Sequence, residues 1–324
     1  MPESFAVLGG AVLTALAVDA CVGEPPARWH PVVWVGHYLG RAGRSIAPLA
    51  SSRQPCAARS FALGALAWCA GAVVVWLLAA GLAAVVHSLP EIAAALVMGL
   101  ALKPLLAWRM LRDEVTGVEQ ALSRSLDDGR VRLARLVSRD TSVLDATAVR
   151  EATIETLAEN LNDSVVAPLF WFVVAGLPGA ALYRFANTAD AMWGYRGERA
   201  GRDWTFAGRW AARADDVLSW VPARLTALLL CLPRALPALR YLPAQARLTP
   251  SPNSGWPMAA MALALGIRLA KPGVYILHAR GRSPLAQDTA RALRTAAGVV
   301  HVIWMAAAFT ALAALLLLAA GPRP

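Results

Sequence analysis

Residues 61–86, FALGALAWCAGAVVVWLLAAGLAAVV, form a run of 26 residues without a charge. About 20 apolar residues suffice for a helix to cross the hydrocarbon layer of a bilayer. The whole chain follows the same trend, because 57% of its 324 residues are hydrophobic and only 16% are charged. Its mean hydropathy is +0.49, whereas soluble domains carry about 25% charged residues. The composition therefore predicts an integral membrane protein.

Further apolar stretches predict an all-α, polytopic helical bundle that forms one membrane domain over 1–324, with helical cytoplasmic loops. We expect about five to six membrane segments, at 5–20, 61–86, 91–108, 164–183, 217–236 and 295–320. The N-terminal segment lacks a basic start and a small-residue cleavage site, so we interpret it as a retained membrane helix. Residues 256–268 are apolar but too short to span, which favours a re-entrant or interfacial helix.

The polar stretches between these segments raise a question of topology. Residues 109–163 are predicted to form a helical hairpin broken at Asp-Asp-Gly. This insert and the stretch 184–216 are both rich in arginine, with eight and six respectively, and the positive-inside bias places both in the cytoplasm. The sequence VVAGLPGAALYR contains Gly176, Pro178 and Gly179, which loosen or break a helix. A broken or re-entrant hairpin over 155–190 and a simple kinked crossing are equally favoured.

Charge and cysteine content exclude several protein classes. The formal net charge of +10 reflects loop arginines, and no basic run is interleaved with aromatic residues, so we do not expect nucleic-acid binding. The four cysteines show no CxxC spacing, which argues against a zinc site or a disulfide framework. The chain also lacks GxxxxGK[ST], GxGxxG, GxSxG and HExxH motifs, so any use of ATP would not involve a Walker A loop.

An acidic stripe enters the fourth apolar segment at ETLAENLNDSVVAPLFWF, residues 155–172. If 151–166 is one helix, Glu151, Glu155, Glu159 and Asn162 fall on one face, within about 80° of arc. Such a stripe calls for Mg²⁺, an ammonium group or an arginine from another segment. A solvated acidic face is the alternative, but acids at membrane depth are costly and usually functional.

Other polar motifs each have a structural and a functional interpretation. NTADAMWGYRGER, 187–199, suits either a metal-bridged phosphate with arginine clamps or an interfacial belt with snorkelling arginines. SRDTS, 138–142, is typical of a helix cap. SPNSGWP, 251–257, suits either a turn or an anion site at a helix start. His30, in the proline-rich loop after the first segment, is interpreted as structural.

Taken in order, the strings DACVGEPPARWHPVVWVG, LVSRDTS, IETLAENLNDSVVAPLFW, NTADAMWGYRGERAGRDWTF and SPNSGWPMAAMALALGIRL resemble the membrane-bound cobalamin-biosynthesis proteins of the CobD/CbiB type. The resemblance runs from about residue 8 to residue 295. It departs from the family pattern at Met258, where a Glu is usual, and this weakens a role for that position.

The resemblance implies an adenosylcobinamide-phosphate synthase, which is an ATP-dependent acid–amine ligase. The expected substrates are adenosylcobyric acid and (R)-1-aminopropan-2-ol, free or as its O-phosphate, with ATP and Mg²⁺. The resemblance further implies a multi-pass protein of the bacterial inner membrane whose active site faces the cytoplasm. Other cobalamin-assembly enzymes are candidate partners besides the lipid bilayer, and a homo-oligomer is compatible with the sequence.

Within that chemistry we assign candidate roles to the polar residues. The expected metal ligands are Glu155, Glu159, Asp163 and Asp190. The expected catalytic residues are Asp140, Glu159 and Asp190, with Asp140 as a candidate base for the amine proton. The expected substrate- or phosphate-binding residues are Arg139, Asn160, Asn162, Asn187, Arg196, Arg199 and Asn253. Trp171, Trp193 and Trp204 are candidates to line a corrin cleft, with ordinary core or belt positions as the alternative.

Two other functions stay open at this point. A membrane prenyl- or alcohol-phosphotransferase also places Asn and Asp clusters at helix mouths to bind Mg-diphosphate, although NLND and NTAD lack the repeated aspartates at i,i+4. A non-catalytic membrane scaffold for soluble cobalamin enzymes is the second alternative.

Overall fold

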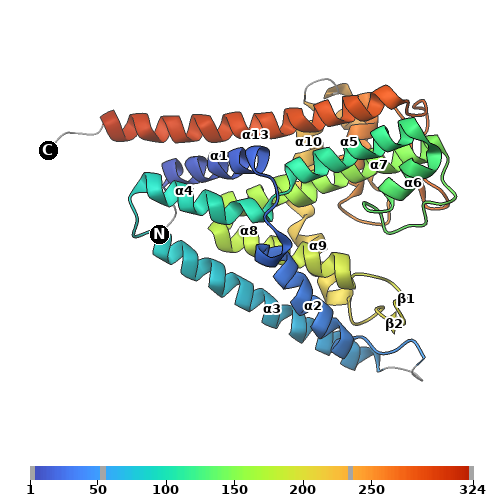
Figure 1. The fold of residues 1–324 in the computed structure, drawn as a ribbon, viewed down its shortest axis with the longest axis horizontal. Coiled ribbons are helices and arrows are strands. Elements are labelled where there is room, and N and C mark those ends of the chain that lie inside the picture. The colour runs from blue at the N-terminus through green and yellow to red at the C-terminus, as the bar shows by residue number, and fades with distance from the viewer. Residues whose placement is uncertain (1–3, 52–55, 233–235, 321–324) are drawn as a thin grey trace. The chain divides into compact units, whose positions relative to one another are not determined.

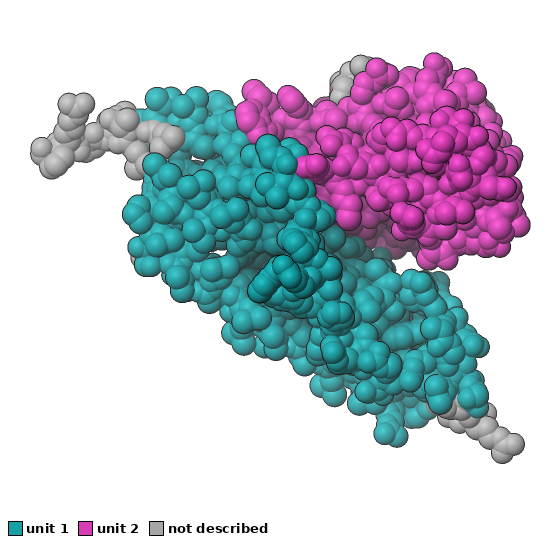
Figure 2. All heavy atoms as spheres, viewed as in Figure 1, with its two compact units in different colours: residues 1–106, 167–218, 306–324 teal, residues 107–166, 219–305 magenta. Residues whose placement is uncertain are grey.

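The computed structural model describes residues 4–51, 56–232 and 236–320. Within these ranges the chain is predominantly helical (Figure 1). Two short antiparallel hairpins, β1-β2 and β3-β4, make up its sheet structure. It divides into two compact units: unit 1 comprises 1–106, 167–218 and 306–324, and unit 2 comprises 107–166 and 219–305 (Figure 2). The prediction of an all-α fold is confirmed.

Unit 1 is built from long apolar helices, with α1 packed along α4 and α3 along α8. Its elements are α1 (Phe5–Cys21), the 3₁₀ turn η1 (Ala27–Trp29), α2 (Pro31–Ile46), α3 (Ala57–Val86), α4 (Glu91–Leu102), the 3₁₀ turn η2 (Lys103–Leu105), α8 (Ala167–Trp193), β1 (Glu198–Arg199), β2 (Arg202–Asp203) and α9 (Arg209–Leu218).

Unit 2 packs α5 against α6 and α7, and α10 against α12. Its elements are α5 (Trp108–Arg124), α6 (Leu126–Leu133), α7 (Ala146–Leu161), the π-helical turn η3 (Asn162–Val166), α10 (Trp220–Cys231), the 3₁₀ turn η4 (Leu236–Arg240), α11 (Leu242–Ala246), α12 (Gly255–Leu265), β3 (Leu269–Lys271), β4 (Tyr275–Leu277) and the first part of α13 (Ala286–Ala320). The remainder of α13, from 306 onward, belongs to unit 1.

Four helical stretches are long and apolar enough to cross a membrane: Ala57–Val86, Glu91–Arg124, Ala146–Trp193 and Ala286–Ala314. These stretches contain the predicted segments 61–86, 91–108 and 164–183, and they cover most of 295–320. The segment 5–20 corresponds to the shorter helix α1. The prediction of one continuous segment over 217–236 is wrong, because α9 ends at Leu218 and α10 has only 12 residues; residues 233–235 lie outside the described ranges. Helix α12, at 11 residues, is short as expected.

The predicted break near Gly176 is present within α8. Ala175 and Gly176 have non-helical dihedral angles, with φ of −137° and 63°, and Pro178 follows at once. A Cβ added at Gly179 would lie 2.5 Å from the carbonyl oxygen of Trp171. Residues eight apart in a straight helix are separated by about 12 Å, so the two limbs of α8 bend sharply toward each other. The break is therefore confirmed, and the choice between a broken or re-entrant hairpin and a simple kinked crossing stays a prediction.

Two local predictions in the polar insert are corrected. The break in 109–163 does not lie at Asp127-Asp128-Gly129, because these residues belong to α6. The break is at Ser125, whose side chain accepts a hydrogen bond from the N–H of Asp128 and caps α6. The two aspartates then lie in the first turn, where the helix dipole favours negative charge. The expected single helix over 151–166 is also interrupted, since α7 gives way to the π-helical turn at Asn162.

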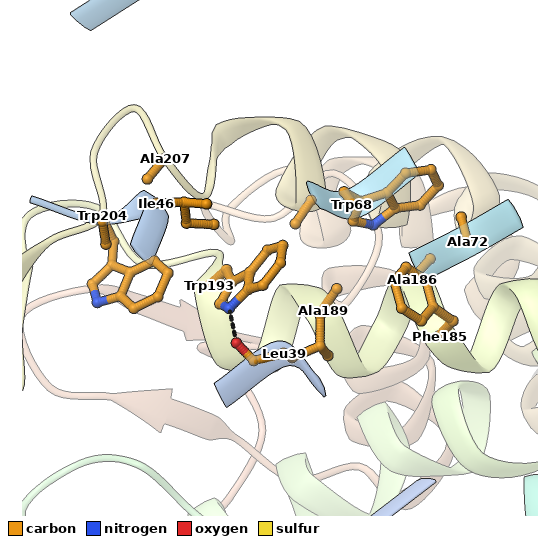
Figure 3. Close-up of a cluster of buried hydrophobic side chains, with 12 residues drawn as sticks. Leu39, Ile46, Trp68, Ala72, Phe185, Ala186, Ala189, Trp193, Trp204 and Ala207 are labelled. Carbon is orange, nitrogen blue, oxygen red and sulfur yellow. Dashed lines mark hydrogen bonds between the residues drawn. The ribbon is translucent and has the colours of Figure 1, made fainter. Parts of the chain in front are cut away.

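The core of unit 1 contains tryptophans that pack at the C-terminal end of α8. Trp193 is 1% exposed, stacks on Trp204 at 6.4 Å, and donates from Nε1 to the Leu39 carbonyl oxygen at 3.1 Å (Figure 3). A Cβ at Gly208 would lie 1.6 Å from the Trp193 carbonyl oxygen, so only glycine permits this approach. The structure thus places Trp193 and Trp204 in a packed core.

A buried ion network orders the loop after α1. Lys103 is 3% exposed and lies 3.0 Å from Asp19 and 3.0 Å from Glu24. His30 contacts Glu24 through Nε2 at 3.0 Å, and its Nδ1 accepts from the N–H of Val32 to cap α2. Although burial opposes the shift, the hydrogen bonds from His30 and Lys103 lower the pKa of Glu24. The structural interpretation of His30 therefore fits its observed contacts.

Candidate functional site

One pocket of unit 2 contains several of the predicted polar residues. It has a volume of about 160 Å³, and we call it the α7 pocket. Its lining comprises Leu136, Val137, Ser138, Arg139, Glu155, Thr156, Glu159, Asn160, Met258, Lys271 and Tyr275. A space of this size accommodates a phosphoryl group or a small amine, whereas pockets for drug-sized ligands measure about 300–1,000 Å³.

Helix α7 supplies the acidic wall of the α7 pocket. Asp145 caps α7 by accepting a hydrogen bond from the N–H of Ala148 at 2.7 Å. Glu155 and Glu159 follow at i,i+4, and Asn160 is adjacent. Residues at this spacing lie one above the other on a helix face, so the two carboxylates reach the same space. The expected acidic stripe is therefore present in this part of the helix.

An ion pair holds one side of the pocket. Arg139, in the loop between α6 and α7, donates from Nη2 to Glu155 Oε2 at 2.8 Å. The Glu155 side chain is 3% exposed. Its other oxygen, Oε1, is buried and accepts no hydrogen bond within 3.5 Å from the described residues, although the Tyr275 hydroxyl interacts with the Glu155 carboxylate. An unsatisfied buried carboxylate oxygen is costly, so this atom favours a ligand that brings a donor or a cation.

The β3-β4 hairpin supplies the opposite chemistry. Pro272 and Gly273 form its turn, with φ of 72° at Gly273 and a hydrogen bond from the Val274 N–H to the Lys271 carbonyl. Proline followed by a glycine with positive φ is the pattern of a type II turn. Lys271 and Tyr275 pair directly across the hairpin, so both side chains lie on one face.

Lys271 forms no ion pair within 4.0 Å in the described chain, so its ammonium group can serve a ligand anion. The Tyr275 hydroxyl lies 3.8 Å from Met258 Sδ. Burial, followed by the Glu155 and Glu159 carboxylates, raises the pKa of Tyr275. The phenol therefore remains a proton-bearing donor at neutral pH.

Other members of the acidic stripe have different partners. Glu151 accepts a hydrogen bond from Arg268 at 3.2 Å. In the π-helical turn, Asn162 is 3% exposed; it donates to Asp163 Oδ1 at 2.8 Å and accepts from Thr226 Oγ1 at 3.0 Å. Asn162 and Asp163 do not line the α7 pocket. For Glu151 and Glu155, the cation that the stripe requires is an arginine from another segment.

Asp140 and Asn253 also lie outside the pocket lining. The exposed Asp140 carboxylate accepts a hydrogen bond from the N–H of Ser142. The side-chain and backbone hydrogen bonds from Ser142 lower the pKa of Asp140, which makes it a weaker base. Asn253 is buried, and its Oδ1 accepts from Arg224 at 2.5 Å. This contact joins Asn253 to α10, which does not line the α7 pocket.

The remaining predicted residues belong to unit 1. Asn187 Nδ2 lies 3.4 Å from Asp215 Oδ1, and Asp190 is half-buried on the same helix, α8. Arg199 stacks on the Tyr195 ring at 3.7 Å. Their participation in one site with the α7 pocket stays a prediction.

Arg196 and Trp171 are the other predicted residues in unit 1. Burial raises the pKa of Asp216, while the charge of the exposed Arg196 opposes that shift. The half-buried Trp171 donates from Nε1 to the Leu218 carbonyl oxygen at 2.9 Å.

The family of the chain follows from its sequence relatives. The family model described as CobD/Cbib protein matches residues 12–297. The chain belongs to the CobD/Cbib family. It is 39% identical over 320 residues to a probable cobalamin biosynthesis protein CobD of Thermococcus kodakarensis, with 96% of each chain covered. It is 40% identical over 303 residues to the cobalamin biosynthesis protein CobD of Stutzerimonas stutzeri, covering 90% of this chain and 92% of the relative.

A third CobD/Cbib relative, the cobalamin biosynthesis protein CobD of Chromobacterium violaceum, is 39% identical over 316 residues, which cover 94% of this chain and 96% of the relative. No solved structure gives a significant match to the chain. The recognised family is the one that the motif strings resemble, so that prediction is confirmed.

Metal binding by this CobD/Cbib protein has to be judged from its donor set. Within the described ranges, no group of three or more His, Cys, Asp and Glu side chains is arranged to hold a metal ion. Mg²⁺ is usually bound by one or two carboxylates together with substrate phosphates. Glu155 and Glu159 do not form a closed protein site, so a Mg²⁺ ion at this pocket would be held mainly by substrate phosphates, with at most one or two of these carboxylates.

Lys271 and Tyr275 are polar members of the α7 pocket that the sequence motifs do not identify. They are 116 and 120 residues from Glu155 in sequence, counted from the numbering. The signal that could have located them is KPGVY, 271–275, whose Pro-Gly pair predicts a tight turn. The turn alone does not indicate which helix the hairpin packs against; in the structure β3 packs on α7.

Proposed function

We propose that the chain acts in cobalamin biosynthesis as an ATP-dependent acid–amine ligase, joining aminopropanol O-phosphate to the propionate carboxyl of adenosylcobyric acid. The similarity to cobalamin biosynthesis proteins CobD supports the pathway. The observation that carries the choice of reaction is the composition of the α7 pocket. This pocket of about 160 Å³ is lined by two cations, Arg139 and Lys271, and by two carboxylates, Glu155 and Glu159.

This charge pattern supports a small zwitterion as the ligand. Aminopropanol O-phosphate carries an ammonium group and a phosphate a few atoms apart. We assign the phosphate to Lys271 and Arg139, and the ammonium group to Glu155 Oε1, which accepts no hydrogen bond within 3.5 Å from the described residues. A charge-assisted hydrogen bond is worth about 1.5–3 kcal/mol. The corrin macrocycle exceeds the pocket, so only its reacting side arm would approach the amine.

The residues of the pocket also provide for proton transfer. ATP supplies the activation of the carboxylate, and Mg²⁺ supplies neutralisation of phosphate charge. We assign Glu159 to accept the proton that the amine loses as it attacks, because Glu159 lines the pocket and Asp140 does not. Tyr275 retains its proton and can donate a hydrogen bond to a phosphate or carbonyl oxygen. Asn160 orients the ligand through its amide.

A reconstituted reaction tests the proposal. Purified full-length protein is incubated with adenosylcobyric acid, MgATP and aminopropanol O-phosphate, and the amide product and ADP are quantified. We expect product with the wild-type chain. Lys271→Gln and Glu159→Gln should each lower kcat/KM by about 10- to 1,000-fold, as losses of charge-assisted contacts and of a general base do.

Arg280→Gln is the matched control, because Arg280 is an exposed charged residue of the same unit outside the pocket lining. It should react like the wild type. Absence of product from the wild-type chain, with product appearing only when soluble cobalamin enzymes are added, would instead support the scaffold alternative.

A further inference from the structure

A second, larger cavity lies in unit 2 and is not used by the proposed reaction. Its volume is about 580 Å³, and its lining residues include Trp220, Arg224, Arg247, Thr249 and Trp256. We call it the α10 cavity, since Trp220 and Arg224 come from the start of α10. No Asp or Glu is among its lining residues in the described chain. The cavity is therefore positively charged and partly aromatic.

Arg224 is held in a fixed position in this cavity. Its guanidinium carbon lies 4.5 Å from the Trp220 ring centroid and 4.6 Å from that of Trp256. It donates to the carbonyl oxygens of Trp220 and Pro252 at 2.9 and 3.1 Å, and to Asn253 Oδ1 at 2.5 Å. A guanidinium has five N–H donors, so these three hydrogen bonds leave two donors for a ligand.

Arg247 lines the same cavity from the end of α11. Its exposed side chain forms no ion pair or hydrogen bond with any residue in the described parts of the chain. An unpaired arginine beside a fixed arginine suits a phosphate, because the planar guanidinium matches phosphate oxygens in pairs.

An apolar stripe runs from the cavity along α10. Val221, Leu225, Leu228 and Leu232 are exposed by 44%, 36%, 42% and 46%. Their spacing of four, three and four residues places them on one face of a helix. Exposed aliphatic side chains on an apolar helix of a membrane protein face acyl chains, and tryptophans gather at the level of the headgroups. The stripe and the cavity together present an apolar track that ends in two arginines.

We propose that the α10 cavity binds the headgroup phosphate of an anionic phospholipid, whose acyl chains lie along the α10 stripe. The shared chemistry is a phosphate anion, which could also be free in solution. The apolar stripe favours the lipid, because exposed leucines contribute apolar contacts to acyl chains and none to a soluble anion. The site is separate from the α7 pocket, as the two linings have no residue in common.

Native mass spectrometry of the full-length protein in neutral detergent tests this assignment. The protein is titrated with phosphatidylglycerol or with phosphatidylcholine, and the apparent Kd of the first bound lipid is measured. We expect phosphatidylglycerol to bind about tenfold tighter, because both lipids carry a phosphate but only phosphatidylcholine adds a quaternary ammonium, which the two arginines repel. Arg247→Gln and Arg224→Gln should abolish that preference. The Arg247 side chain has no partner to lose in the described chain, so its variant tests the site even if Arg224→Gln fails to fold.

Three results would overturn the proposal. Retention of the preference in Arg247→Gln and in folded Arg224→Gln would place the lipid elsewhere. Loss of the preference in the control Arg280→Gln would indicate a general effect of net charge. Displacement of the lipid by millimolar inorganic phosphate, at constant ionic strength, would identify a soluble-anion site.

Discussion

The pairing of Arg139 with Glu155 predicts a measurable coupling between the two side chains. At 2.8 Å and an effective dielectric constant of about 20, their gross attraction is about 6 kcal/mol. Desolvation offsets much of this gain. Removing Arg139 leaves the Glu155 carboxylate buried and uncompensated, which we expect to cost about 3 kcal/mol of unfolding free energy.

The reverse change should cost less. Glu155→Gln removes the buried charge, and the Arg139 side chain, 20% exposed, can remain hydrated, so we expect about 1–2 kcal/mol. The double variant should resemble Glu155→Gln, which gives a coupling energy of about 3 kcal/mol. Reversible denaturant titration of the protein in mixed micelles measures all four corners of the cycle. Additive effects, or a fully stable Arg139→Gln, would refute the pairing.

Three other changes have defined outcomes. Glu24→Gln should flatten the acid dependence of the free energy of unfolding. Because the folded-state pKa of Glu24 is lowered from 4.5, the stabilisation by its carboxylate is complete above pH 4.5 and is lost as the pH falls through the lowered pKa. An unchanged acid limb in Glu24→Gln would contradict this. Gly208→Ala should lower the free energy of unfolding by about 2 kcal/mol or more, because the added methyl group overpacks against Trp193. Thermal unfolding measures this loss, and an unchanged unfolding temperature would contradict it. Asp140→Asn should retain near-normal ligation, and a large fall in kcat would instead indicate that Asp140 takes part in the reaction.

Hydrophobic patterning predicts much of the helical architecture because long apolar runs have few alternatives in a membrane protein. Residues 61–86 lie wholly within α3, and the break near Gly176 occurs where glycine and proline weaken the helix. The division of 217–236 into two helices is not visible in composition. Residues on both sides of Ser219 are equally suited to a helix, so composition does not locate the break between α9 and α10.

The candidate site was predicted only in part because helical periodicity describes one helix at a time. It located Glu155 and Glu159 on a common face, and the neighbouring motif contained Arg139. The π-helical turn at Asn162 adds a residue to the turn, so a projection at 100° per residue fails beyond Leu161. Lys271 and Tyr275 reach the pocket through a long-range contact between β3 and α7, which no local pattern encodes.

Calorimetric binding of the two forms of the amine tests the central claim most directly. We predict that the purified protein binds aminopropanol O-phosphate at least about tenfold tighter than free aminopropanol, through contacts of its phosphate with Lys271 and Arg139. Lys271→Gln should remove most of that difference, and Arg280→Gln should retain it. Equal affinity for the two amines, or an undiminished preference in Lys271→Gln, would contradict the assignment of the α7 pocket.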